Sequence, residues 1–423
     1  MVQDITKQVK RRRVFYIPGY DPFPARRYRE LYRSEGQNQA DLSGYELELT
    51  GKSASDVYGW QVHATVDGQV VDADIDVLVW SDIVQDSMAT GILATYWQMV
   101  RTAWIYIQTG ALRRMMWLRK GPIIAALYPV GMLLLQLLLA VIVFWFVSRL
   151  TSTLMHMVVE LFTGPVLFGP AFVIRTYLSM AFGVVAGVFV LRWFKSMDHK
   201  VFAYYLMHDY AFIAQNRGAY PPELEARMQR FGDAIGAALR DNVDEVLVVG
   251  HSSGAHLAVS ILADLVRAGR VPKNGPALAF LSLGQVVPMV SFLPNAQRLR
   301  ADLHDLSNTD ALTWVDVTAP GDGCSFALCD PVSVSGVAPK SKRWPLVFSA
   351  AFSKSLSPAK WKALRRRYFR LHFQYLCAFD QPMDYDYFQI TAGPLTLAER
   401  YRDRAPSKSR IDVSASPYTS VSA

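Results

Sequence analysis

A serine flanked by small residues stands where a short apolar run gives way to a helical pattern. The pentapeptide Gly250-His251-Ser252-Ser253-Gly254 follows the apolar residues 246–249 and opens a helix expected over 253–268. A serine hydroxyl is a weak nucleophile, and it attacks a carbonyl carbon when a neighbouring base removes its proton. Glycines allow the tight, strained turn that presents such a hydroxyl at a sheet edge. The motif therefore predicts nucleophilic catalysis at Ser252, with a purely structural Gly/Ser turn as the competing interpretation.

The elements around this motif alternate between strand and helix. Short apolar runs bounded by turn residues predict strands, and longer stretches with a period near 3.6 predict helices. The expected strands are 14–17, 45–49, 58–66, 70–74, 75–80, 245–249, 277–283 and 312–317, and the expected helices are 24–35, 222–240, 253–268 and 295–306. This alternation predicts an α/β fold with a mostly parallel sheet and helices on both of its faces.

On these residues the chain resembles the α/β-hydrolase superfamily, in which the GxSxG serine occupies a strand-to-helix turn. The resemblance covers the first strand unit and the chain after Pro222. It implies a triad in the chain order serine, acid, histidine. The expected organisation is a hydrolase domain in two parts, residues 1–100 and 221–404, separated by a membrane insertion at 101–220. The serine-rich tail 405–423 is expected to be disordered.

By this resemblance the acid follows the strand at 312–317. Asp322 in the loop 318–323 is the preferred candidate. Asp316, which lies within the strand, and Asp330, which lies further along before a proline, are the alternatives. An ordinary turn residue in a Gly-Asp-Gly loop is the structural interpretation of Asp322.

The chain order also selects the histidine. His256 follows the serine too closely and His304 precedes the last expected strand, so His372 is the histidine that remains for the base. Residues 361–378 look helical or extended, whereas the superfamily base normally occupies a loop after the last strand. A structural histidine packed among aromatic residues is therefore the alternative for His372.

Two backbone amides are expected to stabilise the negative charge that develops on a carbonyl oxygen under attack. One is the N–H of Ser253, directly after the nucleophile. By resemblance, the other comes from the loop after an early strand, here Pro18-Gly19-Tyr20. Because proline has no N–H, Gly19 or Tyr20 is the expected donor, and a plain Pro-Gly turn is the alternative.

Two apolar stretches predict membrane helices. Residues 122–148 contain no charged side chain, and 177–191 form a shorter run whose small residues suit packing against the first helix. Residues 157–174 are interrupted by two Gly-Pro pairs, which favours a re-entrant or interfacial segment over a third span. Basic residues on the outer flanks predict a multi-pass protein, as in a bacterial inner membrane, with the hydrolase domain facing the cytoplasm.

Composition agrees with a soluble domain joined to a few membrane segments, because hydrophobic residues make up 51% of the 423 residues and charged ones 19%. The net charge of +8 comes with basic clusters at 7–13, 113–120 and 192–200, which we assign to lipid headgroups rather than nucleic acid. The N-terminus lacks the apolar region of a secretory signal. Three cysteines form no CxxC pair, and we expect no cofactor and no metal.

The sequence thus predicts a membrane-anchored serine hydrolase that cleaves an ester and transfers its acyl group through Ser252. A lipid acyl ester is the expected substrate, since a hydrophobic insertion suggests that substrate arrives from the bilayer. The expected partners are membrane lipid and the bilayer. An acyltransferase on the same fold and a catalytically silent membrane scaffold are the alternatives.

Overall fold

The structure is a computed structural model that describes residues 8–52, 57–163 and 170–422 and divides into two compact units. Unit 1 comprises Met1–Ser87, Trp104–Ala125 and Ile213–Ala423, and unit 2 comprises Met88–Ala103 and Ala126–Phe212. The second unit differs in its bounds from the insertion expected at 101–220, because 104–125 and 213–220 are grouped with the sheet. Within that segment, the Tyr106 hydroxyl donates a hydrogen bond to the Met289 carbonyl oxygen, 2.9 Å away.

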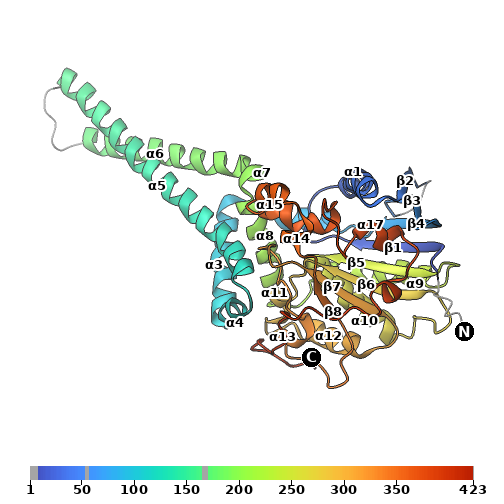
Figure 1. The fold of residues 1–423 in the computed structure, drawn as a ribbon. Helices are drawn as coiled ribbons and strands as arrows, with labels where there is room; N and C mark the ends of the chain where they lie inside the picture. The colour runs from blue at the N-terminus through green and yellow to red at the C-terminus, as the bar shows by residue number, and fades with distance from the viewer. Residues whose placement is uncertain (1–7, 53–56, 164–169, 423) are drawn as a thin grey trace, which may run out of the picture. The chain divides into compact units, whose positions relative to one another are not determined.

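Unit 1 is built on an eight-stranded sheet with the order β2-β3-β4-β1-β5-β6-β7-β8 (Figure 1). The strands in the order β4-β1-β5-β6-β7-β8 are parallel to their neighbours, whereas the pairs β2–β3 and β3–β4 are antiparallel. The strands are β1 (Arg11–Ile17), β2 (Glu46–Gly51), β3 (Gly59–Val66), β4 (Gln69–Val77), β5 (Glu245–His251), β6 (Ala277–Leu283), β7 (Thr313–Thr318) and β8 (Leu346–Ser349). The expected α/β class with a mostly parallel sheet is confirmed.

The central strands are buried on both faces, as their continuous apolar runs require. Every residue of β5 is buried, and β1 lies between β4 and β5 with Val14 opposite Ile75 and Leu247. The carboxyl ends of β1, β5, β6 and β7 meet at one edge of the sheet, the edge where ligands bind in open parallel sheets. Ser252 follows β5 at this edge.

Two expected strands differ from the structure. Residues 70–74 and 75–80 were expected as separate strands, but β4 runs without a break to Val77, because no turn residue interrupts it. The four-residue strand β8 was not expected, since so short a run gives almost no periodic signal.

Helices cover both faces of the sheet. Helix α1 contacts β2, and α17 contacts β1, β3 and β4. Helix α10 packs on β5 between α9 and α12 (Figure 1). The helices assigned wholly or mainly to unit 1 are α1 (Arg26–Ser43), α2 (Ser81–Met88), α4 (Ala111–Leu118), α9 (Pro222–Ala238), α10 (Ser253–Arg267), α11 (Pro288–Ser291), α12 (Gln297–Asn308), α13 (Pro331–Val334), α14 (Phe352–Ser355), α15 (Pro358–Leu364), α16 (Tyr368–His372), the 3-10 helix η1 (Gln374–Leu376), α17 (Tyr387–Ala392) and α18 (Leu397–Arg400).

The tail from Ala405 was expected to be disordered, whereas its described residues form backbone hydrogen bonds with the rest of unit 1. Ser407 N–H donates to Val347 O at 2.9 Å, and Ile411 N–H donates to Leu328 O at 2.7 Å. Side-chain composition gave no sign of this, because the tail is fixed through backbone groups rather than through apolar burial.

Unit 2 contains most of the long apolar helix α5 (Lys120–Thr163) and all of α6 (Pro170–Ser196), together with α7 (Asp198–Val201), most of α8 (Ala203–Ala214) and part of α3 (Ile92–Gln108). Two stretches, Lys120–Phe162 and Phe172–Ser196, are long and apolar enough to cross a membrane. The larger apolar side chains along both helices are mostly exposed, as expected of helices that face lipid.

Helices α5 and α6 contact each other through small residues. A Cβ atom built on Gly183 would lie 2.7 Å from the Phe144 carbonyl oxygen, and one built on Gly187 would lie 3.2 Å from the Ala140 carbonyl oxygen. Gly183 and Gly187 are four residues apart, so they share one helix face and let the two backbones approach closely.

The expected re-entrant segment at 157–174 is not seen in the described part of the chain. Residues 157–163 continue α5, and 170–174 begin α6. The first Gly-Pro pair and Gly169 lie outside the described residues. A helix gains one backbone hydrogen bond for each residue added, which favours extension of both helices over a broken segment.

Candidate active site

The turn between β5 and α10 holds Ser252 in a strained backbone conformation. Its φ is 57° and its ψ is −122°, a region that costs a non-glycine residue roughly 1–3 kcal/mol. The Ser252 N–H donates to the Leu283 carbonyl oxygen on β6 at 2.9 Å. Ser252 is partly exposed, whereas its neighbours in the turn are buried. The turn therefore presents the hydroxyl at the carboxyl edge of the sheet, as the sequence predicted.

The glycines of the motif are required by close backbone approach. A Cβ atom on Gly250 would lie 2.7 Å from the Ala255 Cα, and one on Gly254 would lie 2.7 Å from the Pro18 carbonyl oxygen. Either side chain would push α10 away from β5 or from the loop after β1. The same physical reason that made the motif informative in sequence is thus visible in its contacts.

Asp322 and His372 form a buried pair. The His372 Nδ1 and the Asp322 Oδ2 are 2.8 Å apart, and the aspartate is only 2% exposed. Burial alone would raise the pKa of Asp322, but the adjacent His372 and the hydrogen bonds to the carboxylate outweigh it, so this pKa lies below its ordinary value. Asp322 is therefore ionised at neutral pH and accepts a hydrogen bond from the Nδ1–H of His372, which leaves Nε2 as the basic atom of the ring.

The two alternative acids have other surroundings. The Asp316 carboxylate accepts a hydrogen bond from the Ser282 hydroxyl at 2.5 Å, and burial raises its pKa to about 8. Asp330 caps α13 by accepting from the N–H groups of its first turn, and its other oxygen lies 2.5 Å from Lys342 Nζ. Neither contacts a histidine within the described residues, so Asp322 is the acid that the structure pairs with a base.

His372 lies beside the serine turn. Its ring centroid is 4.8 Å from that of His251. Gly284 follows Leu283, whose carbonyl oxygen accepts the hydrogen bond from Ser252, and a Cβ on Gly284 would lie 3.1 Å from His372 Cε1. In the described chain no hydrogen bond joins the Ser252 hydroxyl to His372. General-base contacts often tighten only when substrate binds, so proton transfer requires the ring to move toward the serine hydroxyl.

His251 holds the backbone of His372. Its Nε2 lies 3.0 Å from the His372 carbonyl oxygen. Burial, followed by the charge of His372, lowers the pKa of His251 to about 3, so the ring is neutral and donates from Nε2. The sequence alone assigned no role to His251. Its role depends on a residue 121 positions away, which no local pattern reveals.

Tyr375 was likewise missed as a partner of the acid. Its hydroxyl donates to the Asp322 Oδ2 at 3.0 Å and accepts from the Ala319 N–H at 2.9 Å. The phenol therefore fixes the carboxylate relative to the loop after β7. In sequence, Tyr375 was only one of several aromatic residues near His372, so its type gave no specific signal.

The loop after β1 lies against the nucleophile. A Cβ on Gly19 would lie 2.9 Å from the Ser252 Cβ and 3.3 Å from its Oγ. The loop is fixed by Trp80, whose Nε1 donates to the Pro18 carbonyl oxygen at 2.9 Å, and by a 2.5 Å contact between the hydroxyls of Tyr20 and Ser87. Among the described residues, the N–H groups of Gly19 and Ser253 donate to no backbone carbonyl. Both groups are therefore suited to binding an oxyanion.

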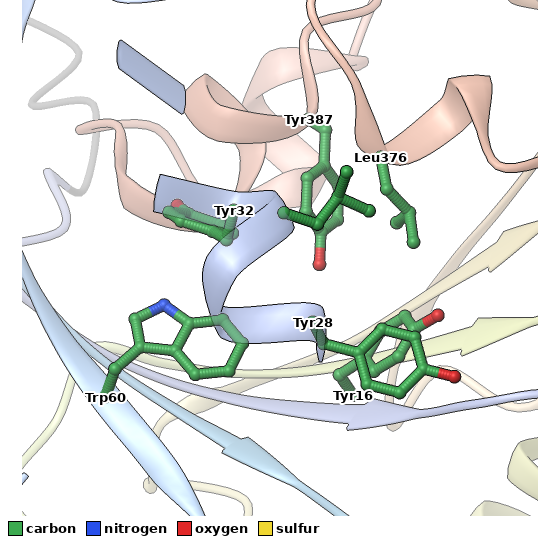
Figure 2. A pocket seen from close by; sticks show the side chains of 7 residues that line it. Tyr16, Tyr28, Tyr32, Trp60, Leu376 and Tyr387 are labelled. Carbon is green, nitrogen blue, oxygen red and sulfur yellow. The ribbon is translucent and has the colours of Figure 1, made fainter. Parts of the chain in front are cut away.

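A small cavity lies behind β1 rather than at the serine. Figure 2 shows its aromatic lining, with Tyr28 and Tyr32 from α1 close to Tyr16 and Trp60 from the sheet. Its volume of about 10 Å³ is room for one water molecule, too little for an ester substrate. The cavity is lined by Tyr16, Tyr28, Leu31, Tyr32, Trp60, Leu376 and Tyr387.

Asp322, His372 and Cys324 form a group whose ligand atoms lie within 4.8 Å of one another. Such a set could in principle hold a metal ion. However, two ligand atoms bound to one tetrahedral zinc ion are about 3.3 Å apart. The His372 Nδ1 and the Asp322 Oδ2 are only 2.8 Å apart, which is a hydrogen-bonding distance. The other carboxylate oxygen accepts from the Cys324 N–H at 2.9 Å. The donor set therefore fits an acid-base pair better than a metal.

Asp384 and Asp386, two acidic residues close together before α17, have structural contacts. Asp386 caps α17 by accepting from the N–H groups of Phe388 and Gln389, and Asp384 lies 2.8 Å from Arg404. These contacts account for both carboxylates without a bound ligand.

Comparison with known proteins adds no relative to this description. Neither a family model, nor a curated protein, nor a solved structure matches the chain.

Proposed function

We propose that this protein is a membrane-anchored serine hydrolase of the α/β-hydrolase type. Ser252 is the nucleophile, His372 is the base, and Asp322 orients and stabilises the histidine. The observation on which the proposal mainly rests is the buried 2.8 Å contact between Asp322 Oδ2 and His372 Nδ1 beside a serine with a φ of 57°. This combination of strained serine, imidazole and carboxylate is the arrangement that activates a hydroxyl in acyl transfer.

In this mechanism the Ser252 oxygen forms a bond to the acyl carbon while its proton passes to His372 Nε2. The carbonyl oxygen becomes negatively charged and accepts hydrogen bonds from the N–H groups of Ser253 and of Gly19 or Tyr20. Collapse of the tetrahedral intermediate breaks the ester C–O bond, and His372 returns its proton to the leaving alcohol. Water then attacks the acyl-enzyme by the reverse sequence of proton transfers and releases the acid.

A lipid acyl ester is the proposed substrate class. The two stretches long and apolar enough to cross a membrane support anchorage in a bilayer, and an enzyme held there meets lipid esters at high local concentration. We further propose a multi-pass arrangement with the sheet-bearing unit in the cytoplasm, which the basic residues flanking the apolar stretches support.

Two other functions fit the same residues. An acyltransferase would pass the acyl group from Ser252 to an alcohol or amine rather than to water. A catalytically silent scaffold is favoured by the unbridged gap between the Ser252 hydroxyl and the His372 ring. Product analysis with and without an added alcohol acceptor separates hydrolase from transferase, and absence of turnover with every ester tested would favour the scaffold.

The direct test is ester turnover by the detergent-solubilised full chain. Ser252→Ala is expected to lower kcat on a p-nitrophenyl acyl ester by a factor on the order of 10³ or more. Ser253→Ala is the matched control, because it removes a neighbouring hydroxyl but keeps the backbone N–H. Equal turnover by the wild type and Ser252→Ala would refute the proposal.

A further inference from the structure

The positive charge of this chain is concentrated in one stretch. Between Pro331 and Phe379 there are ten Lys and Arg residues and no Asp or Glu, so with a total net charge of +8 the rest of the chain has 8 − 10 = −2. The ten are Lys340, Lys342, Arg343, Lys354, Lys360, Lys362, Arg365, Arg366, Arg367 and Arg370. The surplus of positive charge therefore lies mainly in this stretch. The clusters at 7–13, 113–120 and 192–200, to which the sequence had pointed, do not account for it.

Two arginines of the N-terminal basic cluster have a structural role instead. Arg12 is 1% exposed, and its Nε lies 2.6 Å from a Glu245 carboxylate oxygen. Arg13 lies 2.5 Å from Asp76. Both arginines are thus paired within the sheet and unavailable to a charged partner outside the protein.

In contrast, residues 354–370, which we call the basic segment, expose their charges. Six of its side chains are exposed, and none of the six forms an ion pair within the described residues. They are Lys354, Lys362, Arg365, Arg366, Arg367 and Arg370. Tyr368 is 56% exposed in their midst, and Trp361 is partly exposed. Unpaired like charges at this density repel one another, so an anionic partner would stabilise the segment.

The basic segment adjoins the loop of the acid. A Cβ on Gly321 would lie 3.0 Å from the ring atom Cζ3 of Trp361. A Cβ on Gly323 would lie 3.1 Å from the ring atom Cδ1 of Tyr368. A Cβ on Gly121 would lie 3.2 Å from the Gly323 Cα. These residues all belong to unit 1.

Gly121 places the basic segment near the start of a candidate membrane helix. It opens the charge-free stretch of α5, which continues to Ser148. Arg119, just before it, donates from Nε to the Ala327 carbonyl oxygen at 2.7 Å, which ties the helix start to the loop after β7. If α5 enters the bilayer here, the membrane surface lies within a few residues of the acid loop and of the basic segment that packs on it.

We propose that the basic segment binds the phosphate headgroups of anionic phospholipids at the membrane surface where α5 begins. Clusters of four to eight Lys and Arg residues next to a membrane helix have the charge for such binding, and guanidinium groups match phosphate oxygens in bidentate geometry. Tyr and Trp side chains between the charges suit the headgroup layer. The inference rests on the membrane anchorage proposed above but is independent of hydrolysis.

The test uses the full chain in mixed micelles of detergent, phosphatidylcholine and phosphatidylserine. The protein is captured by an affinity tag, and the retained lipids are measured by mass spectrometry. Arg365→Glu/Arg366→Glu/Arg367→Glu is compared with Arg230→Glu/Arg240→Glu/Lys273→Glu, a control that reverses three exposed charges of which none forms an ion pair in the described chain. Arg240 and Lys273 precede β5 and β6, at the opposite edge of the sheet. Thermal unfolding of both variants checks their folding.

Wild type, control and Ser252→Ala are expected to retain phosphatidylserine several-fold above its input proportion. The 365–367 reversal should lower this enrichment by about fivefold or more, and 0.5 M NaCl should lower it in the wild type. Unchanged enrichment in the folded 365–367 reversal would overturn the proposal. So would binding of a single-stranded RNA probe, lost in the same variant, without any preference for phosphatidylserine. A chain that stays soluble without detergent would refute the membrane anchorage itself. Ser252→Ala lacks the proposed nucleophile, so its phosphatidylserine enrichment tests lipid binding independently of the hydrolase proposal.

Discussion

His251 Nε2 donates a hydrogen bond to the backbone oxygen of His372 at 3.0 Å, so the residue before the nucleophile also holds the base. The serine turn and the histidine helix are thereby joined by a hydrogen bond. A turn and a base that move together keep their geometry when substrate binds.

Replacing His251 should separate positioning from folding. His251→Leu is expected to lower kcat/KM for an acyl ester by about tenfold or more, because the His372 carbonyl loses its donor. His251→Gln offers an N–H near the same point and should restore part of the loss. The measurement is the pH profile of kcat/KM, whose limb for the base should shift in the leucine variant. Equal losses in both variants without a shift would indicate packing alone.

Tyr375→Phe removes the hydroxyl that donates to Asp322 while leaving the ring in the core. The carboxylate then keeps its contacts with His372 and the Cys324 N–H, so kcat/KM should fall by roughly 3- to 30-fold with little change in KM. Steady-state kinetics on the detergent-solubilised protein measure this. A rate equal to that of the wild type would mean that Tyr375 does not orient the acid.

Asp316 should make the chain less stable as pH rises. Its pKa is raised by burial to about 8, so between the unfolded value near 3.8 and about pH 8 the folded state holds a proton that the unfolded state has lost. Stability therefore decreases with pH over this window, by at most about 1.4 kcal/mol per pH unit. Asp316→Asn removes the titration, so its stability relative to the wild type should rise from pH 5 to pH 8 in urea unfolding. A pH-independent difference would contradict this account.

Gly183 tests the contact between α5 and α6. Gly183→Leu forces a side chain against the Phe144 carbonyl and should separate the helices, which lowers the unfolding temperature and exposes the region to protease. Gly131→Leu is the matched control, because a Cβ on Gly131 meets nothing within 4 Å. Similar behaviour of the two variants would show that the helices do not depend on close approach.

The elements with strong local patterns were predictable from the sequence. Residues 277–283 coincide with β6, and the Asp67-Gly68 turn joins β3 to β4 as expected. Chain order and the resemblance selected Asp322 and His372, which the structure brings into contact. The resemblance implied a loop for the base, whereas His372 lies in the short helix α16 with its ring against Asp322.

Contacts that depend on distant parts of the chain could not be predicted. The hydrogen bonds of His251 and Tyr375 join segments far apart in sequence, and the C-terminal tail is held by backbone groups whose partners no side-chain pattern reveals. The pairing of Arg12 with Glu245 is of the same kind. Arg12 belongs to a basic cluster that looked suited to headgroups, but its own side chain is buried, because β1 and β5 lie side by side.

Labelling with a fluorophosphonate tests the central claim most directly, because this reagent bonds to a serine oxygen that a nearby base has activated. The detergent-solubilised chain is treated and digested, and the adduct is located by mass spectrometry. The account predicts one adduct per chain on the peptide that contains Ser252, slower labelling in His372→Ala and Asp322→Asn, and none in Ser252→Ala. Equal labelling of the wild type and Ser252→Ala, or no labelling of either in folded protein, would contradict it.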